Sequence, residues 1–337
     1  MGSRDPMRVG RRGVLGLAAA AGTAALGGAA RPARAANGWP TRPVRIVVPF
    51  APGGPSDTHA RLVAEHMARA LGQPFVVENR AGATGAIGTT TVMRAEPDGH
   101  TLLFTTNSSH VLGPLLTRAP AFDPTRDFTD VALHSTFPFY LLVHPALPVR
   151  SAGELVAHAK ANPGRLNYSS PGIGAGGNLM AELFRMRTGI EATHVPYSGA
   201  GPATRALVGG EVQFCFDSVG TAQPLVAEGH LRGLAVTSAR RVAAVPEVPT
   251  LTEAGIPGAE AELWLGLFGP ARLPRPVREA LNAELGRYLA LPETRARLAA
   301  SAYEPAGGPP ETLTARIAGE TERWAEVVRF ANLQQQG

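Results

Sequence analysis

The sequence contains very little cysteine and lysine. Its one cysteine, Cys215, lies in the apolar run VQFCFDS, so an internal disulfide and a cysteine-rich zinc site are excluded and a small buried residue is expected. Its one lysine, Lys160, leaves no Walker loop (G-x4-G-K) and no lysine-based active site. The motifs G-x-S-x-G and H-E-x-x-H are also absent, so two large classes of hydrolase lose support.

The first residues predict an export signal. Arg11 and Arg12 precede an apolar stretch, residues 14–30, which is too short and too rich in Ala and Gly for a membrane span. The sequence PARA then places small residues at Ala33 and Ala35, which predicts a signal peptide, 1–35, cleaved after Ala35. The paired arginines favour the twin-arginine route, with the general secretory route as the alternative. Either route predicts a periplasmic protein.

The remaining chain carries no excess charge. Of 32 basic and 27 acidic residues, the predicted signal peptide takes six arginines and Asp5, which leaves equal numbers of each sign. A nucleic-acid-binding surface, which requires clustered positive charge, is therefore not expected.

Strand-like apolar runs alternate with helix-like segments, which indicates an α/β fold with a largely parallel sheet. Ser151 and Glu154 form a predicted capping box at the start of one helix. The tail, 274–335, is expected to form two long helices without a strand. The strand-like runs are VRIVVPF, FVVEN, TLLFTTN, VALHS, FYLLVHP, LNYSS, ATHVPY, VQFCFDS, LRGLAVTS and WLGLFGP.

Two stretches share the plan of strand, glycine loop and helix. One is VRIVVPFAPGGPSDTHAR, and the other contains Gly172-x-Gly174-x-x-Gly177, the spacing of the dinucleotide-binding fingerprint. That fingerprint requires an acid at the end of the next strand, whereas here this strand ends at Tyr197, so we reject an NAD site and expect no cofactor. Each loop instead exposes the positive N-terminus of a helix, which suits a carboxylate; the alternative for each loop is a tight turn.

Two acids in these regions have a functional and a structural interpretation. Asp57 lies in the first turn of a predicted helix, where a carboxylate stabilises the helix dipole, and we expect this role rather than a catalytic one. Asp217 ends a strand, where ligands bind in α/β folds, although it could also be an N-cap.

Seven stretches taken together resemble the Bug-type extracytoplasmic solute receptors, the binding-protein component of tripartite tricarboxylate transporters. They run in family order over most of the chain that follows the signal peptide. These stretches are VPFAPGGPSDTHAR, VENRAGATGAIG, EPDGHTLLFTT, SPGIGAGGNLMAELF, HVPYSGAGPATRALVGGEVQF, VPEVPTLTEAGIPG and WLGLFGPARLP.

The resemblance implies a type II periplasmic-binding-protein fold, in which two α/β domains are joined by two crossing strands and hold a ligand in the cleft between them. We expect the crossings near FYLLVHP and WLGLFGP. The first domain would then comprise 36–138 and 265–337, and the second would comprise 139–264.

The resemblance also implies a set of ligand-binding residues for a small carboxylate. They are Phe50, Ala51, Gly54, Ser56, Asp57, Asn107, Ser169, Gly174, Ala175, Asn178, Tyr197 and Asp217. The chain departs from the family at Ala175, where a hydroxyl residue is common, at Asn178, where His is common, and at Ser198, where PYKG is the usual form. These changes favour a bulkier or less charged acid than a simple dicarboxylate.

The expected function is therefore that of a monomeric periplasmic solute-binding protein that delivers its ligand to membrane transporter subunits. A sensor that reports ligand to a signalling partner is the first alternative. An enzyme that uses Asp217 or Asp57 is the second, and it is disfavoured because no nucleophile and base converge in the sequence. No metal site is expected.

Overall fold

The computed structural model describes residues 38–334. The predicted signal peptide and its cleavage site lie outside these residues. Within the described part, no helix combines the length and the apolar character needed to cross a bilayer.

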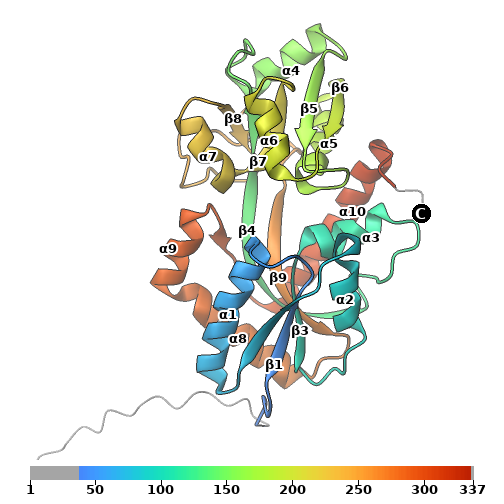
Figure 1. The fold of residues 1–337 in the computed structure, drawn as a ribbon, viewed down its shortest axis with the longest axis vertical. Helices are drawn as coiled ribbons and strands as arrows, with labels where there is room; N and C mark the ends of the chain where they lie inside the picture. Colours follow the sequence, from blue (N-terminus) through green and yellow to red (C-terminus); the bar gives the residue numbers. More distant parts are fainter. Residues whose placement is uncertain (1–37, 335–337) are drawn as a thin grey trace, which may run out of the picture. The chain divides into compact units, whose positions relative to one another are not determined.

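The strands and helices alternate through most of the chain, as the sequence predicts (Figure 1). The strands are β1 (Val44–Val48), β2 (Phe75–Asn79), β3 (Thr101–Thr106), β4 (Phe128–Val143), β5 (Leu166–Ser170), β6 (Ala192–Pro196), β7 (Phe214–Ser218), β8 (Arg232–Val236), β9 (Glu262–Pro270) and β10 (Glu304–Pro305). The helices are α1 (Pro55–Leu71), η1 (Ala83–Gly85), α2 (Ala86–Met93), η2 (Ser108–Leu112), α3 (Gly113–Leu116), α4 (Ala152–Ala161), α5 (Gly176–Thr188), α6 (Ala200–Val208), α7 (Val219–Ala227), α8 (Arg275–Ala290), α9 (Pro292–Ala300) and α10 (Pro310–Phe330).

The sheet is mixed, so the expectation of a largely parallel sheet is only partly right. Its strand order is β2-β1-β3-β9-β4-β7-β5-β6, and β8 and β10 also pair with β4. The pairs of β1 with β2 and β3, and of β5 with β6 and β7, are parallel. The central strands β4 and β9 run antiparallel to their neighbours, because they carry the chain across the sheet rather than following a crossover helix.

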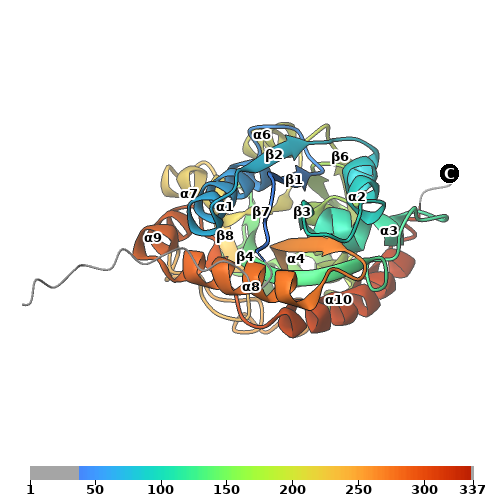
Figure 2. The same ribbon diagram turned by 90° about the horizontal axis from the view of Figure 1, so that it is seen from below.

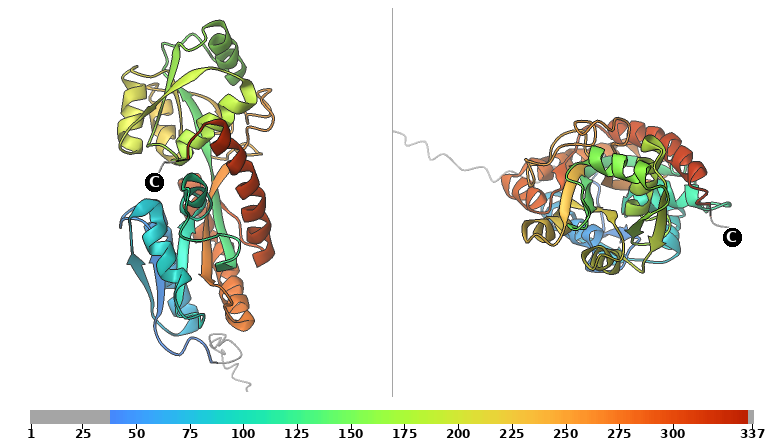
Figure 3. Two further views of the ribbon diagram at one scale, coloured as in Figure 1. Left: turned by 90° about the vertical axis from the view of Figure 1, so that its right-hand side faces the viewer. Right: turned by 90° about the horizontal axis from the view of Figure 1, so that it is seen from above.

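β4 and β9 are the two crossing strands of an α/β periplasmic-binding-protein fold, which confirms the predicted fold class. Residues 128–138 of β4 pair with β9, whereas 139–143 pair with β7. We call the strands β1, β2, β3, β9, β10 and the first part of β4 the first half-sheet, and β5 to β8 with the second part of β4 the second half-sheet. Figure 3 shows both crossing strands, in green and orange, running through the middle of the molecule.

One long strand replaces two expected strands. The runs VALHS and FYLLVHP belong to the single strand β4, whose register shifts between Asp130 and Ala132 and between Leu133 and Ser135. Pro138 lies between the residues that pair with β10 and those that pair with β7. A residue without an N–H group is tolerated there because one ladder ends and the next begins.

Helices cover both faces of the first half-sheet. Buried side chains of α1 and α8, among them Met67 and Leu285, pack against one face, and those of α10, among them Trp324, pack against the other. Figure 2 shows α1 and α8 on one side of these strands and α2 and α10 on the other. This two-sided burial explains why the strands read as continuous apolar runs.

The tail differs from the sequence prediction of two helices. It forms three helices and the short strand β10, whose Glu304 and Pro305 pair with Thr136 and Ser135 of β4. The first break is at Leu291, which takes an extended conformation before Pro292. A residue before proline is disfavoured in the helical region, so this proline separates α8 from α9.

The predicted capping box is half formed. Ser151 Oγ accepts the Glu154 N–H at 3.1 Å and caps α4 as expected. The Glu154 carboxylate instead accepts the N–H of Arg150, one residue before the cap, at 2.7 Å. Cys215 is free and buried, as predicted.

Candidate functional site

The first glycine loop joins β1 to α1 and leaves the helix start without a side-chain cap. Gly53 has φ +85°, and Gly54 is the N-cap, with φ −78° and ψ 171°. No side chain caps this terminus, and Pro55 occupies the first turn. The N–H groups of the first turn have no partners inside the helix, and the helix dipole makes this end positive.

Asp57 braces this loop from inside. Its carboxylate accepts the Gly53 N–H at 2.9 Å and the Arg61 Nε at 3.0 Å, and only 4% of the residue is exposed. Burial raises the pKa of Asp57, but the bonds from Arg61, the Gly53 amide and Asn79 more than offset this, so the net pKa is lowered. The carboxylate therefore has a structural role, as the sequence suggested, and it fixes the turn rather than only stabilising the dipole.

The second glycine loop, before α5, is braced in the same way. The Gly174 N–H donates to Asn178 Oδ1 at 2.8 Å, again four residues further along the chain, and Asn178 Nδ2 donates to the Tyr168 hydroxyl at 3.0 Å. The N-cap residue is Ala175, which cannot cap the helix with its side chain. Both loops thus present uncapped helix starts whose backbone is held by a buried side chain.

The glycine spacing in the second loop has a packing explanation. Gly172 and Gly174 have φ +140° and +75°, which L side chains rarely adopt. A Cβ atom on Gly177 would lie 2.5 Å from the carbonyl oxygen of Phe216. This third glycine therefore allows α5 to approach β7 closely, so the spacing needs no dinucleotide to account for it.

Three further predicted residues form hydrogen bonds to other residues of the protein. Ser169 is fully buried, and its hydroxyl donates to the Ala203 carbonyl at 2.9 Å. Asp217 accepts the Thr204 hydroxyl at 2.7 Å and the Ser218 N–H at 2.7 Å, so it precedes the N-cap of α7 rather than forming it. Tyr197 donates to Glu211 at 3.2 Å.

Asn107, expected to contact ligand, is also fully buried. Its Nδ2 donates to Glu320 Oε2 of α10 at 3.1 Å. Among the twelve predicted residues, Ala51 is exposed and five are partly exposed, namely Phe50, Gly54, Ala175, Tyr197 and Asp217. The structure therefore brings the two loops to strand ends, as expected, but gives most of their side chains bracing roles.

A third loop, which contributed no predicted ligand residue, lies beside the first. Residues 82–85 all have positive φ, including Ala83 at +47° and Thr84 at +53°. Cβ atoms on Gly85 and Gly88 would lie within 3.4 Å of Pro49, in the first loop. Positive φ at two non-glycine residues costs on the order of 1–3 kcal/mol each and is commonly maintained at functional sites. The stretch RAGATG was the only signal for it in the sequence.

A serine and a histidine meet near the second loop, although the sequence gave no nucleophile–base pair. Ser170 Oγ lies 2.6 Å from His194 Nε2. Ser170 is only 1% exposed, and it also bonds Gly172, so it is closed to a substrate and serves to hold the loop. Burial lowers the pKa of His194 to about 4.

Positive side chains contribute little around the loops. Burial lowers the pKa of His59 to about 4 and that of His110 to about 3, so both rings are neutral at pH 7. Arg61 is committed to Asp57. Within residues 38–334 there is no cluster of three or more potential metal ligands from His, Cys, Asp and Glu. None of the three side chains, His59, His110 and Arg61, therefore offers a free positive charge to an anion.

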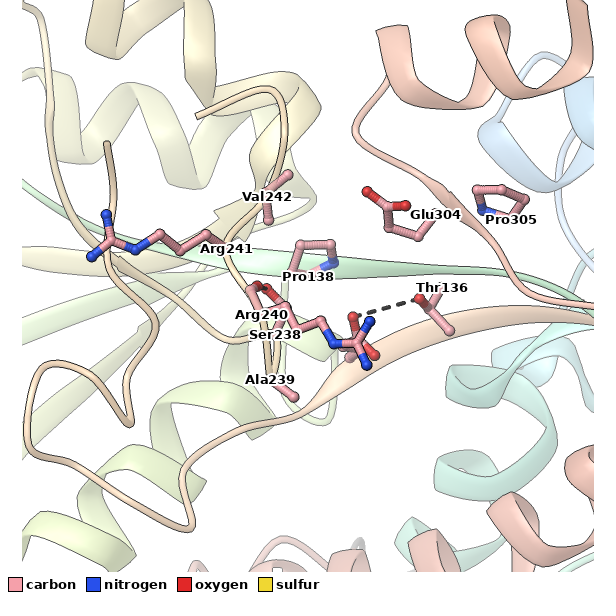
Figure 4. A pocket seen from close by; sticks show the side chains of 10 residues that line it. Thr136, Pro138, Ser238, Ala239, Arg240, Arg241, Val242, Glu304 and Pro305 are labelled. Carbon is pink, nitrogen blue, oxygen red and sulfur yellow. Dashed lines mark hydrogen bonds between the residues drawn. The ribbon is translucent and has the colours of Figure 1, made fainter. Parts of the chain in front are cut away.

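A separate pocket of about 400 Å³ lies where the crossing strands meet the loop after β8 (Figure 4). No predicted ligand residue lines it. Arg241 is paired with Glu253, and Glu262 with Arg316, whereas Arg240 and Glu304 form no ion pair within residues 38–334. The lining residues are Thr136, Pro138, Ser238, Ala239, Arg240, Arg241, Val242, Glu262, Glu304 and Pro305.

The chain matches a known family and several relatives along most of its length. Residues 59–333 match the model of the tripartite tricarboxylate transporter family receptor. The UPF0065 protein in the tcbD–tcbE intergenic region of Pseudomonas sp. strain P51 is 39% identical over 96% of this chain and 95% of its own. Protein BugT of Bordetella pertussis is 34% identical over 87% of this chain and 90% of its own.

Solved structures give the same picture. R. palustris Rpa4515 with adipate is 36% identical, with a TM-score of 0.75, over 87% of this chain and 98% of that one. MatC from Rhodopseudomonas palustris with bound malate is also 36% identical, with a TM-score of 0.72, over 86% of this chain and 100% of that one.

Proposed function

The chain belongs to the tripartite tricarboxylate transporter family of receptors, and from this premise we propose that it captures a small carboxylate between its two braced glycine loops. The family resemblance drawn from the seven stretches is thereby confirmed. A solute-binding role follows from the family. The carboxylate, its place between the loops and its delivery to a transporter are our proposals.

The pairing of two uncapped helix starts carries the proposal. At both α1 and α5, the backbone is fixed by a side chain four residues after a glycine, so the free N–H groups are ordered before a ligand arrives. Each helix start favours an anion by roughly 0.3–2 kcal/mol, and the two together fit a ligand with a carboxylate at each end. We propose the predicted division, 36–138 with 265–337 and 139–264, because it places one loop in each domain.

Two relatives and one departure from the family support our proposal for the ligand class. The structures of Rpa4515 and MatC hold adipate and malate. Ala175, the N-cap of α5, offers no hydroxyl to a ligand. We therefore propose a dicarboxylate at least as long as adipate, rather than a short hydroxylated one.

We also propose that the protein is a monomer exported to the periplasm by the twin-arginine route. There it delivers its ligand to membrane transporter subunits. The family description supports the transporter partner. A small closing motion between the domains would present the loaded form to that partner.

Isothermal titration of the protein that begins at residue 36 tests the ligand class. Adipate, malate and the dimethyl ester of adipate are titrated separately. We expect saturable binding of adipate, weaker binding of malate and none of the ester, because only carboxylates gain from the helix starts. Equal binding of adipate and its ester, or binding of neither acid, would contradict the proposal.

A further inference from the structure

A buried carboxylate on the C-terminal helix joins three elements. Only 4% of Glu320, on α10, is exposed. Its Oε2 accepts Asn107 Nδ2 at 3.1 Å and Trp264 Nε1 at 2.9 Å, and its Oε1 accepts Arg316 Nε at 3.0 Å. These donors come from the loop after β3, from the crossing strand β9 and from α10 itself.

Arg316 is the positively charged partner of Glu320. Arg316 also reaches Glu262 Oε2 at 3.3 Å, so one guanidinium bridges two carboxylates. A buried carboxylate with three donors is held firmly in its geometry, because moving it would break all three bonds and would leave the Trp264 N–H without a partner. Asn107 and Trp264 are thus held at fixed positions relative to α10.

The Asn107 end of this network reaches the loops of the proposed site. Asn107 directly follows β3 and precedes η2, the segment that contains Ser109. Ser109 packs against Gly85, where a Cβ atom would lie 2.1 Å from its hydroxyl, and Gly85 in turn packs on Pro49 of the first glycine loop. A displacement of Asn107 would therefore reach the ligand loops through direct contacts.

We propose that Glu320 is a positioning residue for ligand binding: it holds Asn107, and through Asn107 it couples the ligand loops to the crossing strand at Trp264. This inference rests on the proposed function, because it concerns the affinity of that same site. Glu320 touches no ligand itself, since it lies behind Asn107 and is buried.

A double-mutant cycle on affinity tests the coupling. Glu320→Gln keeps the size of the side chain and loses the ion pair with Arg316, and Asn107→Ala removes the donor. Loss of a buried hydrogen bond of this kind corresponds to roughly a five- to hundredfold change in an equilibrium constant. We expect E320Q to weaken adipate binding by about tenfold in the wild-type background and by less than about twofold in the N107A background.

The indole N–H of Trp264 gives a readout that a purely structural role would not move. Trp264 donates to a carboxylate, whereas the Nε1 atoms of Trp39 and Trp324 have no partner among the described residues. We expect the Trp264 indole signal, assigned with W264F, to shift on saturation with adipate, and this shift to be lost in both N107A and E320Q.

The control is Glu322→Gln, which changes an exposed carboxylate on the same helix and should alter neither affinity nor the indole signal. If the wild type binds neither adipate nor malate, the proposed function fails, and the inference fails with it. If the wild type binds and E320Q binds equally well, or loses the same affinity with and without Asn107, the positioning role alone is overturned.

Discussion

At the scale of single residues, the polar side chains near the proposed site act mainly on their own backbone. Asp57 and Asn178 each accept the N–H of a glycine four residues earlier, and Ser170 holds Gly172. Residue types that often indicate catalysis or direct contact here fix turns instead. Affinity should then respond to these residues even though they touch no ligand.

Replacing Asp57 with Asn tests the bracing role. Asn can still accept the Gly53 N–H, but it loses the ion pair with Arg61 at 2.9 Å. We expect a loss of about 1–3 kcal/mol in the free energy of unfolding, as for a charged buried hydrogen bond, and weaker adipate binding. Chemical denaturation and titration calorimetry check both. The control is Glu65→Asn, which removes an exposed ion pair with Arg69. It should change neither the free energy of unfolding nor adipate binding by much.

The pH dependence of this pair has a definite sign. The folded pKa of Asp57 lies below its ordinary value of 3.8, so the unfolded chain binds more protons at this site as the pH falls. Its contribution to stability is therefore present above about pH 4 and is lost as the pH falls through the folded pKa. The D57N variant should show a shallower loss of stability than the wild type in this acid range.

Buried histidines set a second pH window. The pKa of His59 is lowered from 6.5 to about 4, and His134, whose ring lies 5.3 Å away, is lowered as well. A neutral buried histidine stabilises the fold above pH 6.5, and this contribution is lost as the pH falls towards 4. Between pH 7 and pH 5, protonation of His59 in the unfolded chain lowers the free energy of unfolding by about 2 kcal/mol. Between pH 7 and pH 5, the melting temperature should fall less steeply for His59→Gln than for the wild type. His230→Gln changes an exposed residue, and its melting temperature should follow that of the wild type.

At the scale of elements, helix starts differ in whether a side chain caps them. Among the α-helices of residues 38–334, α4 alone has a side-chain cap, from Ser151, and α1 and α5 share their uncapped starts with the other helices. A capping side chain occupies the same N–H groups that an anionic ligand would use. Capping and ligand binding should therefore compete at α5 and be independent at α4.

Replacing Ala175 with Ser tests this competition. Serine at an N-cap adds about 0.5–2 kcal/mol of stability relative to alanine. We expect A175S to melt at a higher temperature and to gain less stability from adipate than the wild type does. The matched variant is Ser151→Ala, which should lower the melting temperature while the stabilisation by adipate stays unchanged. Equal ligand stabilisation in A175S and wild type would show that the ligand does not use the start of α5.

The element order could be read from the sequence because local signals marked it. Apolar runs, glycine loops and the Ser151 cap predicted most strands and helices. The continuous strand β4, the antiparallel centre and the pairing of Glu304 with Thr136 could not be read, because they depend on strand neighbours far apart in the chain. The bracing role of Asn178 also depends on its contact with Tyr168 in the folded chain.

At the scale of the whole molecule, the pocket in Figure 4 and the start of α5 meet β4 through residues on opposite faces of the strand. Thr136 and Pro138 line the pocket and alternate with Phe139, which lies against the start of α5. Closing the proposed ligand cleft should then widen this pocket. Opposite charges across it, Arg240 against Glu262 and Glu304, should favour the open form.

Replacing Arg240 with Gln should therefore tighten adipate binding. The exposed charges act weakly, at about 0–1 kcal/mol, so the expected gain is at most about fivefold. The control is Arg241→Gln. Arg241 is already paired with Glu253, away from the strands, so this change should leave the affinity for adipate unchanged. Weaker binding by R240Q would contradict this prediction, because it would mean that Arg240 favours the closed form. Titration calorimetry at low ionic strength makes the comparison.

The central claim is that one ligand engages both helix starts through backbone N–H groups. Backbone amide NMR spectra recorded during an adipate titration test it most directly. The account predicts that the amide signals of Gly54 and Ser56, and those of Gly176 and Gly177, shift together along one saturable curve. Shifts confined to one loop, or to the residues of the Figure 4 pocket, would contradict it.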